Sequence, residues 1–243
     1  MKNIVITGGT SGVGYAIAKD LVQDNNIIII GRDHRRGQAA QNILGSHAHF
    51  LAGDLSTEND CQNIKESIEQ LWGKVDVLIN SAGIWPKNTE NNISINLRAH
   101  YAFTMALGSL LRHGRVLIVS GNPMAIQNLP ICEQQGTTMQ RASWLLTHKT
   151  LLTILLSKIL ANNDTTVNSF FPGDIQSNLM PYTQQLMQKT VPVGRFLALD
   201  ESLAHVTGQF FDNQGQLVPL NPNKYSIEEA QNHLTNYLKF HKM

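Results

Sequence analysis

The sequence has few cysteines, little charge of either sign and no long hydrophobic run. Two cysteines in 243 residues cannot build a disulfide framework, so Cys61 and Cys132 are expected to be free thiols in a reducing compartment. The formal net charge is +1, whereas proteins that bind nucleic acid usually carry a basic surplus. The longest aliphatic run, residues 27–30, is too short to span a bilayer. We therefore expect a cytoplasmic protein that has neither nucleic acid nor a membrane as a partner.

Short apolar runs alternate with longer helical patterns along the chain, which is typical of strand–helix–strand units and a parallel sheet. Ser226-Ile-Glu-Glu229 predicts a capping box that opens a last helix toward Leu238. The pattern predicts one domain over residues 1–243, with a Rossmann-type α/β fold: a doubly wound parallel sheet with helices on both faces. Strands are expected at residues 3–7, 27–31, 48–52, 75–80, 115–120, 166–171 and 207–212, and helices at 11–23, 36–44, 58–72, 93–111 and 143–161.

A glycine-rich turn, residues 7–14, lies between the first expected strand and the first expected helix. Gly8 allows a tight exit from the strand, and Gly12 lets the backbone approach a phosphate closely. Gly14 lets the helix pack against the sheet while the N–H groups at its start face the anion. Strand, turn and helix in this order predict a pyrophosphate site for a nucleotide.

The end of the second expected strand bears on which nucleotide is bound. An acidic residue there would accept hydrogen bonds from the ribose hydroxyls of NAD, but the sequence has Arg32, whose guanidinium suits a 2′-phosphate. Arg32 therefore favours NADP as the cofactor. Two alternatives stay open: Arg32 faces solvent or stacks on adenine, and Asp33 reaches a ribose, which leaves NAD possible.

Further motifs follow the glycine turn in a fixed order. They are Asp54-Leu55, Asn80-Ser-Ala-Gly83, and Val167-Asn168 with Pro172-Gly173. Together with the turn they resemble the short-chain dehydrogenase/reductase family over essentially the whole chain, and residues 207–211 resemble its retinol-dehydrogenase-type branch. Taken singly, Asp54 could be an ordinary turn residue and Asn80 a helix cap or Asx turn. Their order behind the glycine turn favours the functional interpretation.

The resemblance implies an oxidoreductase that acts on a small-molecule substrate and assembles as a homodimer or homotetramer. Residues 175–190 stand where the family has its substrate lid, and they are few enough to leave the pocket open. The resemblance also implies a set of cofactor-binding residues: Gly8, Thr10, Ser11, Gly12, Val13, Gly14, Arg32, Asp54, Leu55, Asn80, Ala82, Gly83, Lys149, Pro172 and Gly173.

The family's catalytic pair, Tyr-x-x-x-Lys, is incomplete. The lysine corresponds to Lys149, but the tyrosine position falls on Leu145, and no tyrosine lies between Tyr101 and Tyr182. In the family the lysine lowers the pKa of the phenol and binds the nicotinamide ribose, and the phenol moves the substrate proton. The expected proton donor is therefore missing.

The other catalytic roles are only partly filled. The family's serine falls on Gly121, with Ser120 one residue early, and the resemblance implies that Asn96 orders a water and locally unwinds its helix. His148 is adjacent to Lys149 and about 100° around the helix, so it is expected to face solvent rather than replace the phenol. The candidate catalytic residues are Lys149, Asn96 and Ser120.

Two hypotheses remain. The first is an NADP(H)-dependent oxidoreductase that transfers hydride to or from a small carbonyl, alcohol or activated alkene. The second is a dinucleotide-binding sensor or scaffold without turnover, which the leucine in the tyrosine position favours. No metal site is predicted, because the neighbouring His47 and His49 have no third ligand at a plausible spacing.

Overall fold

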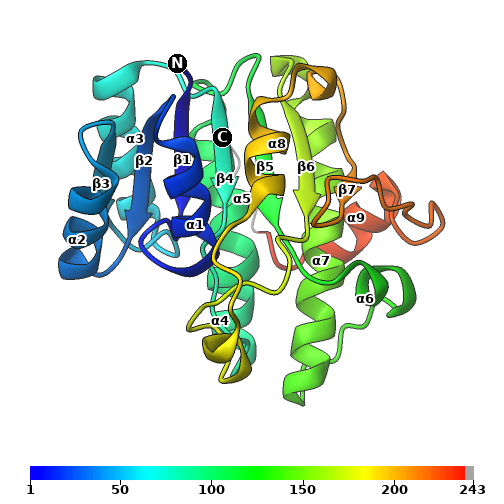
Figure 1. Cartoon of the computed structure of the whole chain (residues 1–243). Coiled ribbons are helices and arrows are strands. Elements are labelled where there is room, and N and C mark those ends of the chain that lie inside the picture. Colours follow the sequence, from blue (N-terminus) through cyan, green and yellow to red (C-terminus); the bar gives the residue numbers. More distant parts are fainter. Residues whose placement is uncertain (239–243) are drawn as a thin grey trace.

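Seven parallel strands form one sheet in the computed structural model, which describes residues 1–238 (Figure 1). Their order is β3-β2-β1-β4-β5-β6-β7, so the direction of winding reverses between β1 and β4. In open parallel sheets, ligands bind beside such a switch point, at the carboxyl ends of the strands. The strands are β1 Asn3–Thr7, β2 Asn26–Gly31, β3 Ala48–Ala52, β4 Val77–Asn80, β5 Arg115–Val119, β6 Thr166–Phe170 and β7 Phe210–Phe211.

Helices cover both faces of the sheet, which confirms the predicted fold class. Ile28 and Ile30 pack toward one face, and Ile27 and Ile29 toward the other, because side chains alternate along a strand. One core contains α1 Gly12–Leu21, α2 His34–Leu44 and α8 Pro192–Leu199. The opposite core contains α3 Glu58–Trp72, α5 Ala99–Ala106, α7 Thr138–Ile159 and α9 Ile227–Leu234.

Short helices fill the connections at both edges of the sheet. They are α4 Thr89–Ile93, the π-helix Ser94–Arg98, α6 Pro123–Asn128, and the 3₁₀ helices Leu160–Asn163, Tyr182–Gln185 and Glu201–Leu203. The sequence pattern did not predict α6 or α8. Both are short and have proline in the first turn, so their stability comes mainly from packing rather than from helical periodicity.

Several predicted elements were wrong in their bounds, including the strand expected over 75–80, which begins at Val77. The helix expected over 93–111 is divided into α4, the π-helix and α5. The helix expected over 143–161 begins at Thr138, where Thr137 and Gln140 form a capping box. The strand expected over 207–212 has only Phe210 and Phe211, because Gly208 has a φ of +70° before it and a turn follows it. Ser226 caps α9 by accepting from the Glu229 N–H, which is one half of the predicted capping box, and the helix ends at Leu234.

The segment Thr138–Asn163 is long and apolar enough to cross a membrane, by length and composition. It is α7 with the 3₁₀ turn that follows, and 61% of its most apolar window is buried inside the fold. Leu151, Leu152 and Leu156 pack in the core under the sheet. Its apolar character is therefore explained by its place as a central core helix.

Candidate active site

The glycine turn lies at the carboxyl end of β1, beside the switch point. Thr7 Oγ1 accepts hydrogen bonds from the backbone N–H groups of Ser81 and Ala82, each at 3.0 Å, which joins the ends of β1 and β4. Gly8 has a φ of +66°, and a Cβ there would lie 2.8 Å from Ala82 Cα. Only glycine allows both the backbone conformation and this close approach.

The start of α1 is available to an anion. Ser11 occupies the N-cap position, yet no side-chain cap bond is present among residues 1–238, so the first N–H groups keep their capacity to donate. Gly12 has a φ of +54°, and a Cβ on Gly14 would lie 2.6 Å from the Gly8 carbonyl oxygen. Gly14 was predicted to let the helix pack against the sheet. This reason was wrong, because the start of α1 packs closely on the glycine turn itself.

The ends of β2 and β3 bring two predicted cofactor residues together. The Arg32 guanidinium lies 3.6 Å from the Asp54 carboxylate, and both side chains are partly exposed. Burial alone would raise the pKa of Asp54, but hydrogen bonds from Ser56 and the charge of Arg32 lower it. A Cβ on Gly31 would lie 2.8 Å from Thr10 Cγ2, which places the glycine turn beside the end of β2, next to Arg32.

Asn80 and Asn96 hold the segment after β4. Asn80 is fully buried, and its amide donates to Thr104 Oγ1 at 2.9 Å. Asn96 accepts from the Ile84 N–H at 2.8 Å and donates to the Ile84 carbonyl at 2.9 Å, and it also donates to Asn92 Oδ1. These contacts give Asn96 a positioning role for the turn that contains Ala82 and Gly83. The helix around Asn96 is widened to a π-helix rather than unwound.

Lys149 is buried on α7 at the end of β5. Its ammonium donates to the Val119 carbonyl at 3.1 Å, and burial lowers the pKa of the side chain to about 8. Lys158, also on α7, is exposed, so Lys149 is the candidate lysine of the site. The other predicted site residues follow strand ends at the same edge: Leu55 after β3, Ser120 after β5, and Pro172 and Gly173 after β6.

Residues 2–124 match the family model for short chain dehydrogenase, which covers half of the chain and contains the glycine turn, Asp54 and Asn80. The chain belongs to the short-chain dehydrogenase family. The residues that match the family model end after β5, before the helix that holds Lys149. The match that shows family membership therefore lies on the nucleotide side of the fold.

Curated relatives and solved structures of short-chain dehydrogenases resemble the chain over most of its length. It is 29% identical to 3-oxoacyl-[acyl-carrier-protein] reductase of Bos taurus over 227 residues, covering 84% of this chain and 90% of the relative. It is 27% identical to carbonyl reductase family member 4 of Xenopus laevis, covering 80% and 85%. A short chain dehydrogenase of Shigella flexneri complexed with NADP has a TM-score of 0.75 at 19% identity, covering 88% and 97%. At that identity the structural likeness shows the fold.

Leucine side chains lie at the positions where the family resemblance places a phenol and a serine. Leu145 lies one helical turn before Lys149, half-buried against the core. A Cβ on Gly121 would lie 2.3 Å from Leu146 Cδ2, so a leucine methyl takes the space of a side chain there. Ser120 Oγ is buried and has no hydrogen-bond partner within residues 1–238.

The prediction that His148 faces solvent was wrong. His148 is fully buried, and its ring stacks on Trp144 with 4.1 Å between centroids. A side chain that lies 100° around the helix from Lys149 faces solvent only if no other segment packs over that face of the helix. Here the segment before α7 and the helix α9 cover it.

Sequence reasoning also missed His100, which follows Asn96 by one helical turn. Its Nε2 lies 2.6 Å from the Ala82 carbonyl oxygen, while its buried Nδ1 has no partner within the described chain. Burial, together with the charge of Lys149, lowers the pKa of His100 to about 3. His100 is therefore neutral at physiological pH and donates to Ala82. The sequence signal that could have identified His100 as a site residue is its spacing of four residues from Asn96.

The lid segment, residues 175–190, contacts the glycine turn. A Cβ on Gly12 would lie 3.1 Å from Ser177 Cβ, so this segment lies beside the glycine turn. Ser177 is held by Thr183, whose hydroxyl bonds back to the 177–180 turn. Leu179, Tyr182 and Met187 are exposed on the same segment.

Proposed function

We propose that the protein binds NADP(H) at the carboxyl edge of the sheet and transfers hydride to or from a small carbonyl, alcohol or activated alkene. The observation that carries this proposal is the glycine turn beside the switch point, with a helix start that has no side-chain cap. The close approaches at Gly8 and Gly14 keep this turn free of side chains. Backbone N–H groups at a helix start are suited to a pyrophosphate.

The residues of the site fit a dinucleotide. The start of α1 would hold the pyrophosphate, and Arg32 would hold a 2′-phosphate by charge-assisted hydrogen bonds, which favours NADP over NAD. Lys149 would hold the nicotinamide ribose, as the family resemblance implies. When bound, the cofactor supplies or accepts the hydride.

The described side chains of the site are poorly suited to donate a proton to the substrate. Lys149 has a lowered pKa, Ser120 has a buried hydroxyl without a partner in the described structure, and His100 is neutral. Ser120 is the group that would polarise a carbonyl, and His100 and Asn96 position the segment after β4. A missing general acid typically costs about 10²- to 10⁴-fold in rate, so slow turnover is expected for ordinary ketones.

Relatives support the proposed class of reaction. Their names describe a 3-oxoacyl-[acyl-carrier-protein] reductase and carbonyl reductases, and one structural neighbour is described as an NADPH dependent reductase involved in bacilysin biosynthesis, with a TM-score of 0.68. Each of these names refers to a reduction. They favour carbonyl reduction as the direction to test first.

A second candidate function is a dinucleotide-binding sensor or scaffold. Leu145 and Leu146 favour it, because they make the catalytic face of α7 apolar where a proton donor is needed. Such a protein would keep the affinity for the cofactor and would lose turnover.

One pair of measurements tests both functions. NADPH is expected to raise the melting temperature of the wild-type protein more than NADH does, and NADPH oxidation is then followed against a panel of small ketones, aldehydes and activated alkenes. Oxidation that depends on a carbonyl supports the oxidoreductase, and a melting shift without oxidation supports the sensor. If neither nucleotide shifts the melting curve of folded protein at millimolar concentration, the proposal of a cofactor site is refuted.

A further inference from the structure

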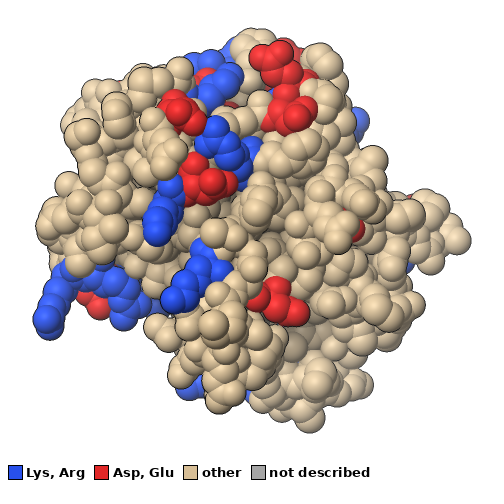
Figure 2. Space-filling view, in the orientation of Figure 1, with Lys and Arg blue, Asp and Glu red and all other residues tan. Residues whose placement is uncertain are grey.

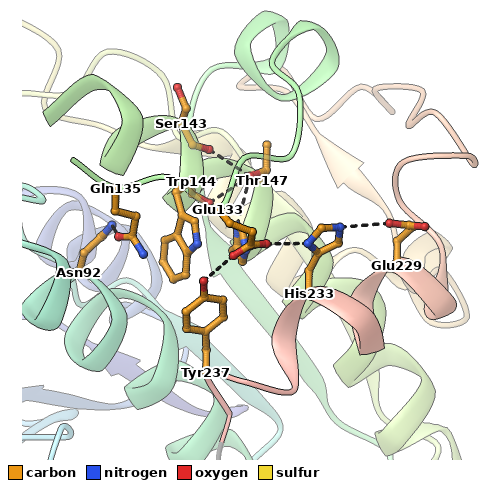
Figure 3. Close-up of polar contacts among 10 residues, drawn as sticks. Asn92, Glu133, Gln135, Ser143, Trp144, Thr147, Glu229, His233 and Tyr237 are labelled. Carbon is orange, nitrogen blue, oxygen red and sulfur yellow. Dashed lines mark hydrogen bonds and ion pairs between the residues drawn. The ribbon is translucent and has the colours of Figure 1, made fainter. Parts of the chain in front are cut away.

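A second cluster of polar side chains lies on the far side of α7 from Lys149. It joins Glu133, in the segment before α7, to His148 of α7 and His233 of α9, and Figure 3 shows Glu133 between Tyr237 and His233. Glu133 Oε1 lies 3.3 Å from His148 Nε2 and 2.6 Å from His233 Nδ1. One potential ligand atom from each residue lies within 4.8 Å of the others. The proposed function does not use this cluster.

The two histidine rings of the cluster both face carboxylate oxygens. His148 Nδ1 lies 2.8 Å from the Trp144 carbonyl, which can only accept, so Nδ1 carries a hydrogen. Nε2 of the same ring faces Glu133 Oε1. His233 lies between two carboxylates, Glu133 and Glu229. A cation at the meeting point would be held by two ring nitrogens and a carboxylate oxygen.

Each of the three side chains is already oriented by a further contact. The Trp144 carbonyl holds the His148 ring, Glu229 lies 3.2 Å from His233 Nε2, and the Tyr237 hydroxyl donates to Glu133 Oε2. Metal-binding histidines usually donate their other ring hydrogen to a carbonyl or carboxylate in this way.

We propose that His148 Nε2, His233 Nδ1 and a Glu133 carboxylate oxygen bind one zinc ion, with water as the fourth ligand. Two imidazoles and one carboxylate suit zinc, which is usually tetrahedral. Bonds of about 2.0–2.1 Å to zinc place tetrahedral ligands about 3.3 Å apart. The 3.3 Å between His148 and Glu133 already has this value, and the shorter contact to His233 needs to open by about 0.7 Å.

The ion has access from solvent and would join three segments of the fold. His148 is fully buried, whereas the Glu133 side chain is about half exposed and that of His233 about a quarter, which leaves an entry for the ion and its water. The same segment holds Gln135, whose side chain accepts from Asn92, and Asn92 accepts from Asn96. Zinc would therefore fix the segment before α7 whose contacts lead to the candidate active site.

The test is a zinc titration of metal-stripped protein by calorimetry and thermal unfolding. Wild-type protein is expected to bind one zinc ion and to melt at a higher temperature. Glu133→Gln and His233→Gln, which each remove a ligand, are expected to weaken binding by more than about 100-fold, and Glu229→Gln, which removes an orienting contact, by about 10- to 100-fold. His49→Gln is the matched control, because it removes an exposed histidine elsewhere and should leave the affinity unchanged.

A measurement on unaltered protein complements the variants. Cobalt(II) added to the metal-stripped wild type is expected to give the intense visible absorption of a four-coordinate ion, and one equivalent of zinc should abolish it. Zinc binding that is equally strong in wild type, Glu133→Gln and His233→Gln would overturn the proposal. So would the lack of a one-to-one complex with wild-type protein at 100-fold excess of zinc. Neither outcome depends on nucleotide binding or turnover.

Discussion

The nucleotide side of the molecule, from β1 to β4, and the catalytic side, from β5 to α7, have kept different parts of the family's pattern. On the nucleotide side the glycine turn, Arg32 and Asp54 lie together as the motifs predict. On the catalytic side Leu145 and Leu146 lie where a phenol and the space for a serine are expected. Figure 2 shows a related contrast: basic side chains gather at the lower left, where α2 lies, and the right half of this face carries few charges.

The difference teaches that binding and chemistry depend on different parts of the chain. The proposed phosphate site is built from backbone N–H groups and from glycines that keep side chains out, so it needs a conformation more than any reactive group. Proton transfer needs one ionisable side chain at one position, and a single substitution removes it. Nucleotide binding and turnover should therefore be separable by mutation in this protein.

The largest expected effect comes from rebuilding the catalytic side. Leu145→Tyr with Gly121→Ser and Leu146→Val should raise NADPH-dependent ketone reduction by about 10²- to 10⁴-fold, because a proton donor and a polarising hydroxyl are restored. Leu146→Val is included because the unaltered leucine lies 2.3 Å from a Cβ on residue 121. The assay is steady-state NADPH oxidation.

The control for this rebuilding replaces Leu145→Tyr by Leu145→Phe, which adds the ring without the proton. Equal rates for the Phe and Tyr versions would show that the phenol is not the missing group. Fast turnover by the wild type that falls on Lys149→Ala would show that another side chain supplies the proton, and the contrast between the two sides would then fail.

A substitution on the nucleotide side is expected to abolish NADPH binding, which is an effect of similar size in free energy. NADPH at about 100 times its Kd should stabilise the wild type by roughly 2.7 kcal/mol, and Gly12→Val should abolish this shift by filling the approach to the phosphate. Gly45→Val is the matched control, since Gly45 also has a positive φ, +90°, but no atom of residues 1–238 lies within 4 Å of a Cβ there. Thermal unfolding with and without NADPH measures both. A shift that persists in Gly12→Val would place the pyrophosphate elsewhere.

Arg32→Asp sharpens the choice of nucleotide. It should weaken NADPH binding by about 1.5–3 kcal/mol, because a charge-assisted contact becomes a repulsion, and it should leave NADH equal or better. Arg112→Asp makes the same charge change at an exposed position before β5, at the opposite edge of the sheet, and should alter neither affinity. Titrations with NADPH and with NADH measure both affinities. If Arg32→Asp weakens the two nucleotides equally, Arg32 does not recognise the 2′-phosphate.

The smallest effect concerns the pH dependence of stability through His100. Because burial and the charge of Lys149 lower the pKa of His100 to about 3, the unfolded chain binds more protons than the folded one below the usual pKa of about 6.5. Stability should fall as the pH is lowered, by about 2 kcal/mol between pH 6.5 and pH 5 from this residue. His100→Gln should flatten that part of the profile in urea unfolding. Identical slopes for the two proteins would show that His100 is not buried as a neutral ring.

Sequence patterns predicted the fold well because the residues that cause each strand or helix to form lie within that element. Residues 3–7 and 48–52 were predicted as strands with the observed bounds, and residues 58–72 as a helix with the observed bounds. Buried parallel strands are short apolar runs, and helices show their period within a few turns. The π-helix at Ser94–Arg98 was missed, because one extra residue in a turn leaves little trace in hydrophobic periodicity.

The sequence by itself determined the order of strands and helices, the glycine turn, and the absence of a tyrosine one turn before Lys149, because each depends on neighbouring residues. Tertiary structure alone decided that Leu146 fills the space beside Gly121 and that His100 lies under Ala82. It also brought Glu133 to His233, which is 100 residues away. Such contacts are set by how α7 and α9 pack on the sheet, and no local pattern in the chain encodes that packing.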